Sequence, residues 1–265
     1  MKPTTRTIIR STLAGASFIA LTAAATAAPA VGLVGDKTLV WFDTDNAEVT
    51  RSVEVEGVDS LMGIDVRPSN NMLYGVDGNG MIVTIDLESG AATMGAELSE
   101  KLPDGVTASV NFNPVADKLR LMGSDGTNLR IDVETGAATV DGSLKFEAGD
   151  ANAEATPNVV ATAYTNGLDK PEKTSMWDID ASLGALLRQT APNDGTLATI
   201  GMLGIEGADH YAIDFEVRAI DDNVLWLAAG NGLYTVNVES GAATMESEFS
   251  GLDGTLRDIA ILPAM

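Results

Sequence analysis

Ile85–Met94 (IDLESGAATM), Ile131–Val140 (IDVETGAATV) and Val236–Met245 (VNVESGAATM) are three copies of one ten-residue phrase. In each copy a run of alternating apolar residues reaches a Glu-Ser-Gly or Glu-Thr-Gly corner, and a second run begins with Ala-Ala-Thr. This pattern predicts a β-hairpin whose glycine takes a positive φ, which a β-carbon would disfavour. The glycines therefore serve backbone geometry rather than chemistry. They are Gly90, Gly136 and Gly241.

Each hairpin is preceded by two more short alternating runs, so the repeating unit contains four strands joined by turns rich in Gly, Asn and Asp. Residues 158–203 form a degenerate fourth unit, in which Gly195 supplies the last corner. A fifth unit is complete only when the apolar runs between residues 32 and 57 are joined with the last run of the chain.

Four-stranded units repeating every 40–50 residues are typical of a β-propeller. We therefore predict an all-β protein, a propeller of five four-stranded blades in which the C-terminal strand Arg257–Leu262 completes the N-terminal blade. Such closure protects strand edges that an open array would leave unpaired. A β-sandwich or a six-bladed propeller is the alternative, because Glu147–Pro157 is long and fits no strand of the scheme.

The first residues have the pattern of a secretory signal peptide: Lys2, Arg6 and Arg10 precede an apolar stretch that ends in small residues. Cleavage after Ala27 or after Ala30 fits this pattern. We expect a signal peptide at 1–27, a single propeller domain at 28–265, and a periplasmic or secreted protein. The chain has no cysteine, which excludes disulfides and the lipid-modified cysteine of a lipoprotein.

The formal net charge is -22, from 38 acidic and 16 basic residues. Such an acidic protein repels nucleic acid and anionic lipid, so we expect no nucleic-acid partner. No later segment is apolar enough for membrane insertion. The expected partner is an unknown small molecule or protein, and the expected state is a monomer.

The innermost strand of each propeller blade lines the central channel, so equivalent positions of these strands meet around the axis. Aligning the five inner strands brings four oxygen-bearing side chains to one level, with Ala163 at the fifth position. The level two residues further on carries Thr165 and Ala260 together with three more polar side chains. The channel-lining candidates are Asp65, Arg67, Asn111, Asn113, Asp214, Glu216 and Asp258.

A ring of three carboxylates and one amide calls for a compensating proton or cation, and Ca²⁺ or Mg²⁺ accepts such oxygen ligands. The candidate metal ligands are Asp65, Asn111, Asp214 and Asp258. No cofactor other than such an ion, calcium first, is expected. The alternative is that each aspartate accepts hydrogen bonds from backbone amides, or pairs with Arg67, Arg120 or Arg130, to lock neighbouring blades together.

The order of motifs along the chain resembles the bacterial domain of unknown function 4394 family. The resemblance rests on GIDVRP, LYG, NFNPVADKLR, NLR, AYTN and PNDGTL together with the GAAT hairpins. It implies an exported, propeller-like domain and no particular activity. The chain departs from the family pattern at Asn111, where Asp is expected, and at Gly167, where Ser is more usual.

Two functions follow from these features. The first is a non-catalytic module that binds a small ligand or a partner protein, and the absence of a complete catalytic set favours it. The single histidine, His210, excludes a HExxH motif, and no GxSxG elbow announces a nucleophilic serine. The alternative is a divalent-metal-dependent hydrolase or lactonase that uses the channel carboxylates.

Overall fold

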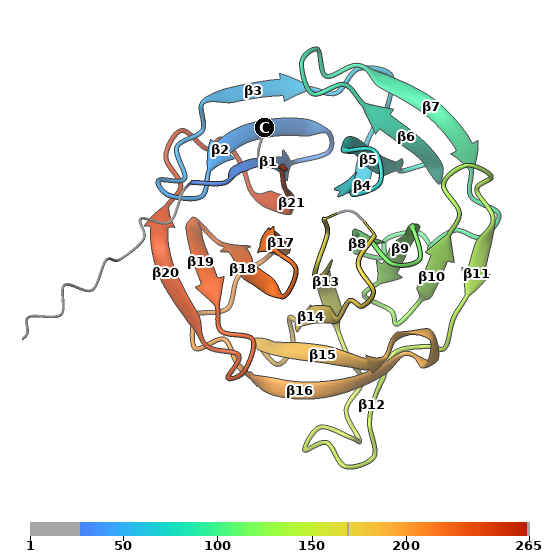
Figure 1. Ribbon diagram of the computed structural model, residues 1–265, viewed down its shortest axis with the longest axis vertical. Helices are drawn as coiled ribbons and strands as arrows, with labels where there is room; N and C mark the ends of the chain where they lie inside the picture. Colours follow the sequence, from blue (N-terminus) through green and yellow to red (C-terminus); the bar gives the residue numbers. More distant parts are fainter. Residues whose placement is uncertain (1–26, 169, 264–265) are drawn as a thin grey trace, which may run out of the picture.

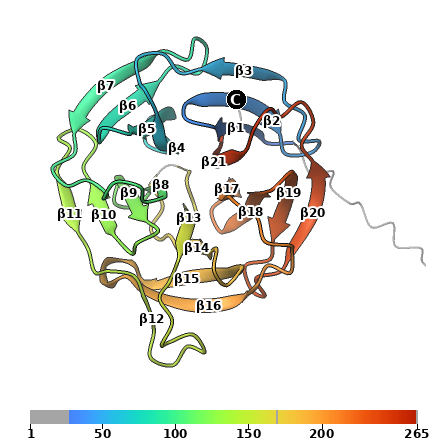
Figure 2. The same cartoon turned by 180° about the vertical axis from the view of Figure 1, so that it is seen from behind.

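Five small sheets stand in a ring around a central axis, as Figure 1 shows and as Figure 2 shows from behind. The structure is a computed structural model that describes residues 27–168 and 170–263. The expected five-bladed, all-β propeller is confirmed, and within these residues the only helical element is a short 3₁₀ turn, η1 (Pro192–Asp194). The signal peptide predicted for residues 1–27 lies almost wholly outside the described residues. No described helix is long and apolar enough to cross a membrane.

Each blade has four antiparallel strands that follow one another from the axis to the rim. Blade 1 contains β21 (Leu256–Ile261), β1 (Pro29–Val34), β2 (Thr38–Asp43) and β3 (Arg51–Glu54). Blade 2 contains β4 (Leu61–Arg67), β5 (Met72–Asp77), β6 (Met81–Ile85) and β7 (Ala92–Glu97). Blade 3 contains β8 (Ala108–Asn113), β9 (Lys118–Gly123), β10 (Asn128–Ile131) and β11 (Ala138–Val140).

The last two blades follow the same order. Blade 4 contains β13 (Val159–Tyr164), β14 (Met176–Asp180), β15 (Ala185–Ala191), β16 (Thr196–Met202) and, as an outermost addition, β12 (Lys145–Phe146). Blade 5 contains β17 (Tyr211–Ala219), β18 (Asp222–Ala229), β19 (Gly232–Val236) and β20 (Ala243–Glu248).

The ring is closed by the last strand of the chain, as the sequence predicts. β21 pairs antiparallel with β1, with Ala30 opposite Ile261 and Leu33 opposite Asp258. The Leu262 amide also donates to the Pro29 carbonyl at 2.8 Å. The N-terminal blade therefore takes its innermost strand from the opposite end of the chain.

The stretch Glu147–Pro157, which raised the prospect of a sixth blade, belongs to the rim of blade 4. The short strand β12 adds to the outer edge of that sheet, pairing parallel to β16. The chain then makes a loop that protrudes from the rim in Figures 1 and 2 before it enters β13. Asp150 fixes this loop by accepting the Thr199 amide at 2.6 Å.

The repeated hairpin also joins neighbouring blades. Gly90, Gly136 and Gly241 have φ of 77°, 72° and 78°, as predicted for the corner. The Gly136 carbonyl of blade 3 accepts the Ser99 amide, which follows the outer strand of blade 2, at 2.9 Å. The Gly90 carbonyl accepts the Glu56 amide, which follows the outer strand of blade 1, at 3.1 Å. The corner of one blade thus rests against the end of the preceding blade.

The hydrophobic core is divided into five clusters, and each cluster fills the space between two adjacent blades. Trp177 packs between blades 4 and 5, and Trp226 packs between blades 5 and 1. Burial of apolar surface between sheets, about 25 cal/mol per Å², is the main force that holds the ring together. The aromatic side chains of the strands are committed to this packing.

Candidate functional site: an acidic cavity on the propeller axis

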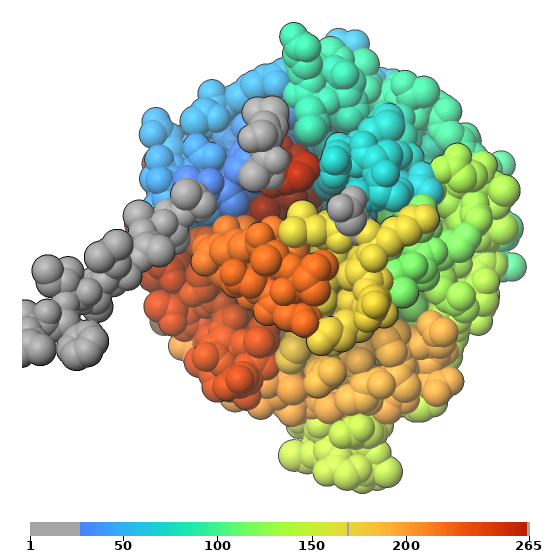
Figure 3. Space-filling model, in the orientation of Figure 1, coloured from blue at the N-terminus to red at the C-terminus, as the bar shows by residue number. Residues whose placement is uncertain are grey.

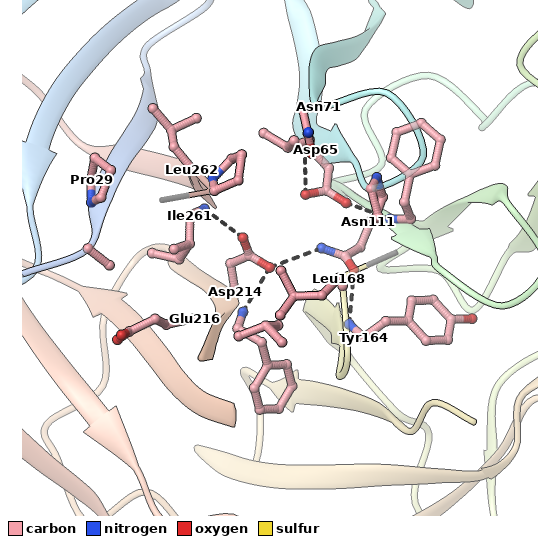
Figure 4. A pocket seen from close by; sticks show the side chains of 18 of the residues that line it. Pro29, Asp65, Asn71, Asn111, Tyr164, Leu168, Asp214, Glu216, Ile261 and Leu262 are labelled. Carbon is pink, nitrogen blue, oxygen red and sulfur yellow. Dashed lines mark hydrogen bonds between the residues drawn. The ribbon is translucent and has the colours of Figure 1, made fainter. Parts of the chain in front are cut away.

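A cavity of about 280 Å³ lies on the axis, where the inner strands β4, β8, β13, β17 and β21 end. The ends of these strands and the segments that follow them line it, so every blade contributes to one enclosure. In Figure 3 the segment after β13, coloured yellow, lies over the middle of this face, and Leu168 from that segment is a cavity wall. Figure 4 shows Asp65, Asn111 and Asp214 together on its floor.

The floor residues link adjacent inner strands through their side chains. Asp65 Oδ2 accepts the Phe112 amide of the next blade at 2.6 Å, and its Oδ1 accepts the Val66 amide at 2.7 Å. Asn111 Oδ1 accepts the Tyr164 amide at 2.9 Å. The side-chain amide of Asn111 donates to Asp214 Oδ1 at 3.4 Å across the axis (Figure 4).

Asp214 makes the equivalent link between blades 5 and 1. Its Oδ2 accepts the Ile261 amide at 2.6 Å, and its Oδ1 accepts the Phe215 amide at 2.8 Å. Hydrogen bonds from backbone amides to the aspartates were the alternative to a metal site in the sequence analysis, and the structure contains such hydrogen bonds. Neutralisation of these aspartates by Arg67, Arg120 or Arg130 does not occur, because those guanidinium groups pair with Asp117, Glu134 and Asp141.

Asp258 does not share the level of the other three residues. Its Oδ2 accepts the Ile64 amide at 2.9 Å, and Ile64 lies one residue before Asp65. Asp65, Asn111 and Asp214 instead accept the amide of the residue that comes one after the equivalent position on the neighbouring inner strand. Ala260 therefore takes the place in β21 that corresponds to Asp65, and the alignment expected from the sequence is shifted by two residues. Asp258 lies beneath the floor and does not line the cavity.

Burial raises the pKa of Asp65 well above its usual range, and repulsion from the carboxylates of Asp214 and Asp258 raises it further. Burial also raises the pKa of Asp214 to about 7 and that of Asp258 to about 8, although two backbone amides donate to each. The charged form is disfavoured because these side chains are removed from water, and the charge of Arg257 offsets this only in part at Asp258. The site is thus stabilised by any proton or cation that reaches it.

Arg67, Asn113 and Glu216, which the sequence placed two residues beyond the aspartate level, each form hydrogen bonds with different groups. Arg67 turns toward blade 3, where Nε and Nη2 donate to the two Asp117 oxygens at 2.9 and 2.8 Å. Asn113 caps its own turn, with Oδ1 accepting the Ala116 amide at 2.9 Å. Glu216 alone of the three lines the cavity, and it accepts from Arg218 Nε at 2.6 Å and from Trp226 Nε1 at 3.0 Å.

Several cavity walls escaped the sequence analysis because they lie at the ends of the inner strands or in the segments that follow them. They include Pro68, Asn71, Leu168, Arg218 and Leu262. The signal that could have found most of them is their position at the end of GIDVRP or shortly after GIDVRP, AYTN and IDFEV, since the cavity opens at that end of every inner strand.

The described residues assemble no metal cluster in the cavity, and the single histidine lies elsewhere. Among the residues described, no group of three or more His, Cys, Asp or Glu side chains is arranged to hold a metal ion. His210 precedes β17, whereas the cavity lies where β17 ends, and it is not a lining residue. The calcium predicted from the sequence stays a prediction.

Comparisons with solved structures show the fold. A protein of unknown function from Bacteroides thetaiotaomicron has a TM-score of 0.52 at 14% identity, over 89% of this chain and 65% of that structure. The chain thus spans slightly less than two thirds of that protein. A gluconolactonase from Xanthomonas campestris has a TM-score of 0.50 at 12% identity, over 88% of this chain and 79% of the other.

A sequence comparison gives the family. None of the curated proteins matches this sequence. The model of the domain of unknown function DUF4394 matches residues 38–260, which include blades 2 to 5 and all of blade 1 except β1 and the last residue of β21. The resemblance carried by GIDVRP, NFNPVADKLR and the GAAT hairpins is therefore confirmed, and the chain is a member of the DUF4394 family.

Proposed function

We propose that this protein is an exported, non-catalytic binding module that holds a small molecule in its axial cavity. The observation that carries the proposal is the cavity itself: about 280 Å³, formed by all five blades and with a floor held by hydrogen bonds to backbone amides. This volume is at the small end of ligand sites, which typically enclose about 300–1,000 Å³. A pre-formed cavity of this size suits a small metabolite.

The hydrogen bonds of the floor favour binding over catalysis. A general base must reach the substrate proton with a free lone pair in a suitable direction. Each carboxylate oxygen of Asp65 and Asp214 already accepts a backbone amide, so these groups are held in fixed positions between the blades and the lone pairs that remain suit a bound ligand. The metal-dependent hydrolase or lactonase is the competing function. The likeness to a gluconolactonase supports the fold alone.

Filling the cavity tests the proposal. Gly167 lines the cavity, and a β-carbon there would meet nothing closer than 3.8 Å, so Gly167→Leu places its side chain into the cavity without backbone strain. Gly149→Leu is the matched control, because Gly149 lies in the rim loop with nothing within 4 Å of a β-carbon. Both variants are compared with the native chain in a thermal-shift panel of amines, sugars, alcohols and carboxylates.

At least one chemical class should raise the melting temperature of the native chain and of Gly149→Leu but leave Gly167→Leu unchanged. A panel in which no class stabilises the native chain, or in which Gly167→Leu responds as well as the control, rejects the proposal. Hydrolysis of an ester or lactone that requires Ca²⁺ or Mg²⁺ and is abolished by Asp214→Ala would establish the competing enzyme instead.

A further inference from the structure

The axial cavity has an excess of negative groups. Asp65, Asp214 and Glu216 line it, and Arg218 is the one basic lining residue among those described. Arg218 is occupied, because its Nε and Nη2 donate to the two oxygens of Glu216 at 2.6 and 3.1 Å. Within the described ranges, neither Asp65 nor Asp214 has an ion-pair partner. The floor is thus a carboxylate pair without a counter-charge.

The carboxylates on the floor of the cavity act as hydrogen-bond acceptors. A carboxylate oxygen has two lone pairs. Both oxygens of Asp65 and the Oδ2 atom of Asp214 use one for a backbone amide. Asp214 Oδ1 uses both, for the Phe215 amide and the Asn111 side-chain amide. The remaining lone pairs belong to side chains that are only 5% and 7% exposed and that line the cavity. These acceptors favour a ligand that brings N–H or O–H donors, and a cationic ligand also stabilises the charged form of both carboxyls.

The walls above the floor include apolar side chains that come from segments on opposite sides of the axis. Pro68, Leu168 and Leu262 face the space above the floor, as Figure 4 shows for Leu168 and Leu262. Such walls favour a short hydrocarbon part over a fully hydrated ion. A divalent metal also needs several converging ligands, and the described part of the chain contains no group of three or more His, Cys, Asp or Glu side chains arranged to hold one.

We propose that the ligand of the axial cavity is a small organic cation, a primary ammonium compound whose N–H groups bind Asp65 and Asp214 and whose hydrocarbon part contacts the apolar walls. This inference rests on the proposed binding function and adds the class of ligand. The net charge of -22 favours the same class, because the field of the whole molecule attracts cations.

Three probes of equal length separate charge from shape: n-butylammonium, 1-butanol and butyrate, titrated at constant ionic strength and followed by ligand-observed NMR. n-Butylammonium should bind at least about tenfold more tightly than 1-butanol, since hydrogen bonds to charged partners are the stronger kind. Butyrate should not bind. CaCl₂ is titrated in parallel to detect a metal site.

Leu168→Lys supplies an ammonium from the protein itself and should abolish n-butylammonium binding, whereas Leu168→Met keeps an apolar wall and should retain it. Asp214→Asn should weaken binding about tenfold or more. Because Asp214 also joins two blades, this variant is interpreted only where its circular dichroism is native. The Leu168 pair leaves the floor intact and tests the proposal independently.

Equal binding of 1-butanol and n-butylammonium, or equal binding by the two Leu168 variants, would overturn the ligand class. Binding of a neutral probe that Gly167→Leu abolishes would still leave the proposed function standing. Calcium binding that Asp214→Asn removes, with no ammonium binding, overturns the organic cation in favour of a metal site. Absence of binding by all probes rejects the ammonium class, and the wider panel with Gly167→Leu then decides the proposed function separately.

Discussion

On the axis, single side chains join neighbouring blades. Asp65, Asn111, Asp214 and Asp258 each accept a backbone amide from the next inner strand. Ala163 stands at the junction of blades 4 and 5, where a methyl group offers no acceptor. Asn111 shows that a neutral side chain makes the same link, so charge is not required for the link. In their ionised form, Asp65 and Asp214, the two aspartates that line the cavity, thus carry a negative charge that is available to select a ligand.

At the rim, Gly136 is required for a close contact between two blades as well as for its positive φ. A β-carbon at Gly136 would lie 1.9 Å from the Glu97 carbonyl oxygen of blade 2, in addition to adopting a φ of 72°. At Gly184 the φ is 60° and nothing lies within 4 Å. The two positions therefore share the backbone conformation and differ in the contact between blades.

Gly184→Ala should lower the free energy of unfolding by about 1–2 kcal/mol, the cost of a left-handed conformation for alanine. Gly136→Ala should lower it by about 1–3 kcal/mol more, because blades 2 and 3 must separate locally to admit the methyl group. Urea denaturation of both variants measures the difference. Equal losses would show that the corner glycines serve the turn alone.

At the scale of elements, hairpins and ring closure were predictable because they follow from local periodicity and turn chemistry. The short strand β12 was not, since a two-residue parallel pairing leaves no periodic signal. The position of Asp258 was misplaced because aspartate was aligned with aspartate, whereas the ladder aligns Ala260 with Asp65. The cavity could not be predicted from the sequence because its walls, such as Leu168 and Leu262, lie in segments that follow the strands.

Closure by β21 makes the fold depend on its last strand. A chain ending at Thr255 loses the inner strand of blade 1 and leaves the β1 edge unpaired, together with the links from Asp214 and Asp258. It should give no cooperative thermal unfolding transition. A chain ending at Leu262 keeps β21 and the Leu262–Pro29 hydrogen bond, and should melt as the full chain does. A native-like transition in the shorter chain would contradict a closing role for this strand.

At the scale of the whole molecule, several buried carboxyls make stability depend on pH. Burial raises the pKa of Asp178 to about 7, of Asp214 to about 7 and of Asp258 to about 8. Both oxygens of Asp178 are buried without a hydrogen-bond partner, and the Gln189 Oε1 atom is likewise unpartnered. Protonation of Asp178 removes its buried charge and turns one of these unpartnered acceptors into a hydrogen-bond donor. The folded state thus binds protons that the unfolded chain has released.

A raised folded pKa contributes stability that is complete below the unfolded value, about 4, and is lost as the pH rises through the folded value. The free energy of unfolding should therefore decrease as the pH rises from 5 to 8, by up to about 1.4 kcal/mol per pH unit for each such carboxyl. The lowered pKa of Asp132, about 2 beside Lys118, acts in the opposite direction only in stronger acid. Maximum stability is expected near pH 4–5.

Chemical denaturation at several pH values between 5 and 8 measures how the free energy of unfolding changes with pH. The composition of the chain helps to assign this slope to the buried carboxyls. The sequence contains a single histidine, so few other side chains titrate in this interval. Asp178→Asn is nearly isosteric and removes one titrating group, and it should flatten the slope while raising stability at pH 8. The exposed Asp209→Asn is the control and should leave the slope unchanged. A stability that is constant or increases from pH 5 to 8 would mean that these carboxyls are compensated in the folded protein by a cation.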